Sequence, residues 1–386
     1  MDMLSVAAGK LASGEMYKTR FEEIEKTAGW NYNADGLGQD RALRPLVDIM
    51  QSGTWDWVHT LFQDGVLTTE VELLIEHCGS IGVTRIALQT FLRDLAWQFP
   101  LAQSGKAKQL HRIFDHHRQS ATAATRVKAS CAELLGVYGL VRHFVEHRLA
   151  PATDDDTKKC LESFKALCQA VDIILLAKKG LASVDVASDS LAVALARFSR
   201  LHRAAYGDDN IRPKHHWLLD IPPQLKRDSL VLDAFVVERT HLMGKGVADH
   251  CKNLSKFEES VLRGLVHTKL AQSKAATDVA TLLGKVERVP GTADTVVADR
   301  MWVSQCSMAV GDVVVRSGSV GRIEACLCEA HTLLVVVEVL AVVARTGAHS
   351  LSVRPCGNNE VWPAAGLELV VAWAAKADGT SVVVAM

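Results

Sequence analysis

The sequence predicts an α+β protein in which a mostly α-helical body is followed by a small all-β domain. Before about residue 300, apolar residues recur at three-to-four intervals, as in segments 131–149 and 190–207, which is the spacing of amphipathic helices. After Pro290, short Val-rich runs alternate with Gly, Asn or Asp turns, as strands do. The 386 residues suffice for two or three domains, and 48% hydrophobic residues can supply a large core.

The helical part is expected to form one domain over residues 51–270, preceded by a leader segment over residues 1–50. Within it, residues 60–210 predict a bundle of about six helices. Residues 211–235 are expected to interrupt the bundle, because their three prolines disfavour a regular long helix. A helix is expected to resume near Asp233 and to carry Glu238 and His241.

The β part is predicted to occupy residues 301–386 after a linker over residues 271–300. Five or six short strands in this length predict a small barrel or a two-sheet sandwich. The stretch GDVVVRSGSVGRIEA, residues 311–325, resembles the first hairpin of SH3-like modules. The domain has five Lys and Arg against seven Asp and Glu, which favours a protein partner or plain packing over nucleic acid.

The cysteines and the apolar runs of the sequence indicate where in the cell the protein is expected. The nine cysteines contain no CxxC pair, and the N-terminal residues do not resemble a secretory signal. The longest apolar run, residues 333–344, is too short to span a bilayer and contains Glu338. We therefore expect an intracellular protein, nuclear or cytoplasmic, that is neither secreted nor inserted in a membrane.

Two short segments place a carboxylate three residues before a histidine. They are Asp56 with His59 and Glu238 with His241, and residues three apart share one face of a helix. Carboxylates favour Mg²⁺ or Mn²⁺, and a pair of such ions can clamp the oxygens of a phosphodiester in transfer. Zinc or a di-iron pair are alternative occupants. Each string is also common by chance and is then purely structural.

The same segments carry a family resemblance. The stretch DWVHTLFQDGV, residues 56–66, is similar to an Asp-x-Met-His-x-x-x-x-Gly/Asn-Val stretch of CACTA-like transposases. Residues 212–241 are similar to their Lys-Pro-Lys-x-His-x-Leu-x-His-x-Pro block and the Phe-Glu-x-x-His that follows. Residues 253–258 fall where those proteins often have an Asn-Phe-Lys-Asn-like stretch. The resemblance covers residues from about 50 to 265.

Members of that group resemble DDE enzymes, whose RNase H-like core holds metal on acidic residues. The resemblance implies Asp56 and Glu238 as catalytic metal ligands with His59 and His241 nearby, and a helical insertion between them. This chain departs from the pattern, because only 55 residues precede Asp56 and no convincing source of the first catalytic Asp is present. The expected protein is therefore a truncated, degenerate relative with a remnant of the RNase H-like core.

A basic stretch offers a DNA-binding surface. Residues 106–128 hold six Lys and Arg against one acid, and such a patch can contact phosphates. A solvated helix face is the alternative reading. The candidate DNA-binding residues are Lys106, Lys108, Arg112 and Arg118, with Arg212 and Lys214 from the later block.

Three functions follow from these patterns. The leading one is a transposon-derived protein, catalytically incomplete, that binds DNA. The second is a helical scaffold or adaptor whose β module, residues 301–386, binds a protein partner. The third is an active metal-dependent nuclease or transposase, which would need Mg²⁺ or Mn²⁺.

Overall fold

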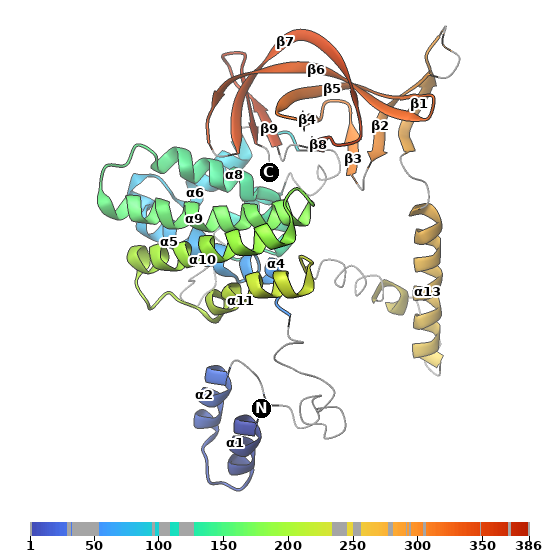
Figure 1. Ribbon diagram of the computed structural model, residues 1–386. Helices are drawn as coiled ribbons and strands as arrows, with labels where there is room; N and C mark the ends of the chain where they lie inside the picture. Colours follow the sequence, from blue (N-terminus) through green and yellow to red (C-terminus); the bar gives the residue numbers. More distant parts are fainter. Residues whose placement is uncertain are drawn as a thin grey trace.

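The computed structural model describes most of the chain. The described residues are 2–28, 32, 54–94, 97–99, 109–115, 127–233, 245–249, 256–276, 281–290, 292, 295–303, 306–347, 349–369 and 372–384. They form a helical body and a curved antiparallel sheet that lies against one side of it (Figure 1). The prediction of a helical body followed by a β region is confirmed.

The helices of the body begin where the sequence supplies capping side chains. Ser130 and Glu133 form a capping box, in which the Ser130 side chain accepts from the Glu133 amide and the Glu133 side chain accepts from the Ser130 amide. The Asp154 and Ser183 side chains cap the next two helices by accepting from the amides of Thr157 and Val186. The helices are α4 (Trp57–Leu61), α5 (Val66–His77), η2 (Gly79–Ile81), α6 (Arg85–Asp94), η3 (Leu110–Phe114), α8 (Cys131–Leu149), α9 (Asp155–Lys178), α10 (Val184–Tyr206) and α11 (Pro213–Asp228).

The helix α11 corrects the expectation that residues 211–235 interrupt the bundle. Pro213 occupies its first turn, where no amide donor is needed, but Pro222 and Pro223 lie inside it. Burial offsets the lost backbone hydrogen bonds, because Ile221, Pro222 and Leu225 are buried. The Pro222 carbonyl also accepts a hydrogen bond of 2.8 Å from the buried Ser188 hydroxyl of α10. Tertiary contacts therefore outweigh the proline penalty.

One continuous apolar core holds the body together. It runs from α4 to α11, and its largest fully buried side chains include Trp57, Phe62, Tyr138 and Phe164. The β region contributes to this core through small side chains of its last two strands, including Ala372 and Val384. The sheet is therefore packed on the body rather than only tethered to it.

The sheet contains ten strands among the described residues and is antiparallel throughout. Its main path runs β1-β2-β5-β6-β7-β10-β9, with β3, β4 and β8 paired off this path. Two of its hairpins have two-residue turns, Ser317-Gly318 and Ala330-His331, and all four residues have positive φ, as type I′ turns require. The strands are β1 (Thr281–Arg288), β2 (Thr295–Val303), β3 (Cys306–Ala309), β4 (Val313–Arg316), β5 (Ser319–Glu329), β6 (Thr332–Arg345), β7 (Ser350–Pro363), β8 (Glu368–Leu369), β9 (Ala372–Ala375) and β10 (Ser381–Val384).

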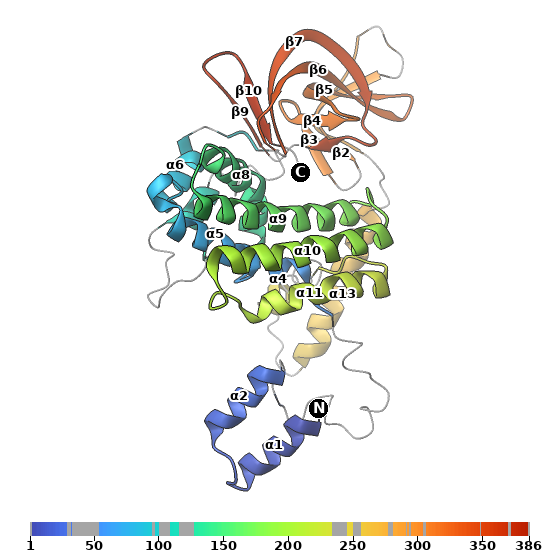
Figure 2. The ribbon, with the colours of Figure 1, turned by 60° about the vertical axis from the view of Figure 1, so that its left-hand side comes forward.

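The β region begins earlier than the sequence indicates. β1 and most of β2 lie within residues 271–300, the segment predicted to be a linker. The sheet curves into a half-barrel with two small apolar cores, one around Met301 and Trp362 and one around Val320 and Val353 (Figure 2). A small β region is therefore present.

Polar contacts join the sheet to α8 and α9. His349 lies between β6 and β7, and its Nε2 is 2.9 Å from Oδ2 of Asp172, which also accepts from the buried guanidinium of Arg142 at 2.7 Å. Beside them, the Ser350 hydroxyl lies 2.8 Å from Nδ1 of His143. A backbone bridge joins Gln98 to Trp373 of β9. These contacts fix the orientation of the half-barrel on the body.

The remaining helices lie outside the body. The helices α1 (Asp2–Ala12) and α2 (Lys18–Ala28) pack on each other within the predicted leader segment, and α13 (Phe257–Ala276) precedes β1. No helix in the described part of the chain is long and apolar enough to cross a membrane.

Candidate functional site

The predicted pair Asp56 and His59 starts the first helix of the body. Asp56 is the N-cap of α4, and its Oδ1 accepts from the Val58 amide at 3.0 Å. Its other oxygen, Oδ2, contacts Nδ1 of His59. The two side chains do share a helix face, as the spacing predicts. Both oxygens of the carboxylate are engaged in local contacts that stabilise the helix start.

The structure brings this helix start onto α11, some 150 residues later in the chain. The ammonium of Lys214 donates to the carbonyls of His59, at 2.9 Å, and Gln63, at 2.5 Å. The rings of Trp55 and Trp217 stack with centroids 4.6 Å apart and planes 10° from parallel. These contacts join the start of the first segment of the family resemblance, residues 56–66, to the first half of the second segment, residues 212–241.

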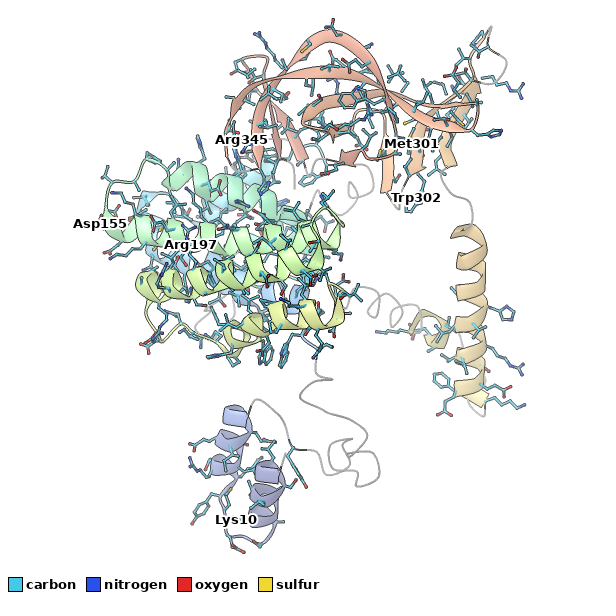
Figure 3. All side chains as sticks on the ribbon, in the orientation of Figure 1. Lys10, Asp155, Arg197, Met301, Trp302 and Arg345 are labelled. Atoms are coloured by element: carbon cyan, nitrogen blue, oxygen red, sulfur yellow. The ribbon has the colours of Figure 1, made fainter. Side chains whose placement is uncertain are left out.

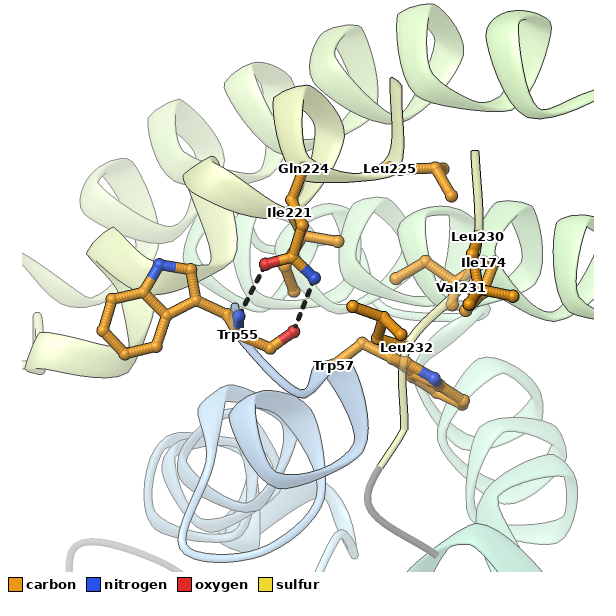
Figure 4. Close-up of a pocket in the computed structure, with 9 residues that line it drawn as sticks. All are labelled: Trp55, Trp57, Ile174, Ile221, Gln224, Leu225, Leu230, Val231 and Leu232. Atoms are coloured by element: carbon orange, nitrogen blue, oxygen red, sulfur yellow. Dashed lines mark hydrogen bonds between the residues drawn. The ribbon is translucent and has the colours of Figure 1, made fainter. Parts of the chain in front are cut away.

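Gln224 completes this junction. Its amide accepts from the Trp55 backbone at 2.5 Å and donates to the Trp55 carbonyl at 2.9 Å, so it pairs with the chain as a neighbouring strand would (Figure 4). Gln224 is buried, and these two bonds hold its amide oxygen and nitrogen. The pair of bonds fixes the path of the chain into α4.

A small pocket lies beside the junction and encloses about 240 Å³ when its open mouth is included. Its lining consists of apolar side chains and the Gln224 amide, so the pocket presents no acid or base for proton transfer. Over its Trp57 wall lies the ammonium of Lys178, 5.6 Å from the ring centroid, which also pairs with Asp233. The lining residues are Trp55, Trp57, Ile174, Ile221, Gln224, Leu225, Leu230, Val231 and Leu232.

The second predicted pair, Glu238 and His241, lies outside the described residues. Its convergence with Asp56 and His59 stays a prediction. Across the described ranges, no group of three or more His, Cys, Asp or Glu side chains is arranged to hold a metal ion. The prediction of a Mg²⁺ or Mn²⁺ site stays a prediction.

The predicted DNA-binding residues fall in three situations. Lys106, Lys108 and Arg118 lie outside the described residues. Arg112 is exposed on η3, which packs on α6 and α8, and Arg212 is exposed at the start of α11, which packs on α4 and α10. Lys214 donates to two backbone carbonyls and so has a structural role.

A buried polar cluster that the sequence did not indicate lies between α5, α10 and α11. Glu70 and His202 are 0% and 1% exposed, and Oε2 of Glu70 lies 2.8 Å from Nδ1 of His202. The His215 ring packs 4.8 Å from the His202 ring, centroid to centroid, and Nδ1 of His215 accepts from the Arg212 amide at 3.0 Å. Burial and the neighbouring His202 lower the pKa of His215 to about 4, so His215 is neutral at neutral pH.

Tyr206 and two cysteines continue this cluster toward α9. Burial and the Glu70 carboxylate raise the pKa of the Tyr206 hydroxyl, which lies beside the Cys160 thiol. Cys160 in turn hydrogen-bonds Cys78, and that bond together with burial raises the pKa of Cys78. The available signal in the sequence was Glu70 itself, an acid inside the apolar run VLTTEVELLIEH.

Comparisons with known proteins identify no relative of this chain. No family model matches this chain, and neither a curated protein nor a solved structure is significantly similar to it.

Proposed function

We propose that the chain is a transposon-derived protein, related to CACTA-like transposases, that binds DNA without cutting it. The observation that carries the proposal is the junction of α4 and α11. Two segments that resemble the same family in sequence, residues 56–66 and 212–241, meet there: Lys214 bonds the first segment directly, and the adjoining Trp55 adds a tryptophan stack and a buried amide. Segments with a shared origin in one fold are expected to keep such contacts.

The proposal includes a remnant of an RNase H-like core and an SH3-like relationship for the β region. It includes no independent catalysis, because no source of the first catalytic Asp was identified and the Asp56 carboxylate caps α4. Two-metal phosphoryl transfer needs carboxylate oxygens that converge on the ions instead.

DNA binding is tested with the full chain and a fluorescein-labelled duplex. Binding measured by anisotropy between 50 and 200 mM salt should weaken steeply, because each phosphate contact contributes a slope of about −0.9 in log K against log salt. Changing Arg112 and Arg212 to Ala together should flatten that slope by about 1–2. Arg197→Ala, an exposed cation on α10 outside the proposed set, is the matched control. Absence of binding at 50 mM salt would exclude the proposal.

The nuclease reading is tested with Mn²⁺. A ligand that binds only the folded chain raises stability by about 2.7 kcal/mol at a hundredfold excess over Kd. We expect no Mn²⁺-dependent rise in Tm for the wild type. A rise that disappears in both Asp56→Ala and Glu238→Ala would show that the two segments bind one metal and would replace this proposal with an enzyme.

The adaptor function is favoured by one observation on the β region. Side chains alternate along β2, where Met301 is buried and the adjacent Trp302 is 42% exposed (Figure 3). Val361 of β7 is also 55% exposed. Tryptophan is enriched among the residues that dominate the energy of protein interfaces, so Trp302 is the candidate contact. Failure to bind DNA, together with a partner whose binding is lost in Trp302→Ser, would favour this second function.

A further inference from the structure

The buried cluster around Glu70 contains polar atoms that the protein does not satisfy. Oε1 of Glu70, Nε2 of His202 and Nε2 of His215 have no hydrogen-bonding partner within the protein, whereas the Tyr206 hydroxyl lies beside the Cys160 thiol. Their residues are at most 9% exposed, and the Glu70 and His202 side chains are 0% and 1% exposed. An unsatisfied buried polar group destabilises the fold, so three such atoms in one cluster call for a partner from outside the chain.

The ring nitrogens identify what that partner must be. Nδ1 of His215 accepts the Arg212 amide, and His215 is neutral, so its proton sits on Nε2 and that atom is a donor. A protonated nitrogen is not a metal ligand. The partner of His215 is therefore a hydrogen-bond acceptor and not a cation.

The two histidines lie next to each other in the cluster. Nδ1 of His202 faces Glu70, and the two nitrogens of an imidazole point in divergent directions, so Nε2 of His202 points away from Glu70. The His215 ring packs against the His202 ring, with centroids 4.8 Å apart and planes tilted by 43°. The unsatisfied Nε2 atoms therefore belong to two neighbouring rings.

We propose that the cluster is a hydrated site, in which one water molecule bridges Nε2 of His202 and Nε2 of His215. Water fits this position whatever the charge of His202. When His202 is neutral, the water accepts from His215 and donates to His202; when His202 is charged, the water accepts from both rings. Internal waters of this kind make about three hydrogen bonds and are costly to remove.

This site would attach the start of α11 to α5 and α10. His215 is linked to the Arg212 amide at the first turn of α11, and Glu70 belongs to α5. The inference does not depend on DNA binding, since it concerns buried atoms only.

The direct test is a crystal structure of the full chain at a resolution that shows ordered water, recorded also at the zinc absorption edge. Density within hydrogen-bonding distance of both Nε2 atoms, without anomalous signal, supports the proposal. Direct bonding of the two rings, or an anomalous peak, overturns it.

Discussion

The helical body and the half-barrel bury their side chains in different ways. The body has one core that extends from α4 to α11 and encloses charged groups such as Glu70. The half-barrel has two small cores and exposes large apolar side chains such as Trp302. The body should therefore be sensitive to single changes at its buried polar groups, whereas the half-barrel should depend on its strand pairing and its contacts with the body.

The largest effect is expected from breaking the Glu70–His202 pair. Glu70→Ala or His202→Ala leaves one charged or polar partner buried alone, which should lower the free energy of unfolding by about 3–5 kcal/mol. Urea denaturation followed by circular dichroism measures this loss.

The control for that prediction is Arg203→Ala, which removes an exposed pair with Asp208 on the same helix and should have no measurable effect. The double variant Glu70→Leu with His202→Leu should recover much of the loss, because both polar partners are then absent. Equal losses in the single and the double variants would contradict this account.

A smaller effect is expected where the half-barrel meets the body. Asp172→Ala removes the carboxylate shared by Arg142 and His349 and leaves the Arg142 guanidinium, 7% exposed, without that partner. The loss should be about 2–4 kcal/mol, because Asp172 itself is partly exposed. Urea denaturation measures this loss. Asp156→Ala, which removes an exposed pair with Lys159, is the control and should leave the stability unchanged.

The contact between His143 of α8 and Ser350 of the half-barrel should make stability depend on pH. Burial, followed by the charges of His147 and Lys376, lowers the pKa of His143 to about 4, while an unfolded histidine has a pKa near 6.5. Between these values the unfolded chain binds more protons, so stability is full above about pH 6.5 and is lost as the pH falls toward 4. His215, with its pKa near 4, adds to the loss in the same window.

The size of this acid effect should be about 2 kcal/mol for each histidine. Thermal unfolding between pH 7 and 4.5 measures it for the wild type and for His143→Gln, in which an amide can still contact Ser350. The variant should show a shallower dependence on pH. An identical slope in the two proteins would assign the acid sensitivity to other groups.

The sequence predicted some of these features and missed others for physical reasons. Periodicity identified the body and the change to strands, because the apolar faces of α8 to α10 and the Val-rich runs are regular. It missed α11 because burial of Ile221 and Leu225 offsets the prolines, an effect of tertiary packing. It also missed Glu70 and His202, because a charged residue on a helix is normally exposed and only its partner on another helix reveals that it is buried.

The contact between α4 and α11 shows a further limit of sequence patterns. The periodicity of apolar residues is a local property of the chain. It therefore does not indicate which distant segments, such as α4 and α11, contact each other. The family resemblance did single out both segments, but not their contact, in which Lys214 donates to two carbonyls beside the start of the helix that Asp56 caps. Among the described residues, the segments meet through packing and backbone hydrogen bonds.

The smallest predicted effect distinguishes a helix-capping role of Asp56 from a metal-binding role. Asp56→Ala removes the N-cap of α4 and should cost about 1 kcal/mol, whereas Asp56→Asn should cost almost nothing, because asparagine caps helices as well as aspartate does. A metal ligand would behave differently, since the asparagine variant would keep its stability without Mn²⁺ but lose any increase in Tm that Mn²⁺ causes. Thermal unfolding of the three proteins with and without Mn²⁺ gives both results, and a structural Asp56 requires that Mn²⁺ has the same effect on all of them.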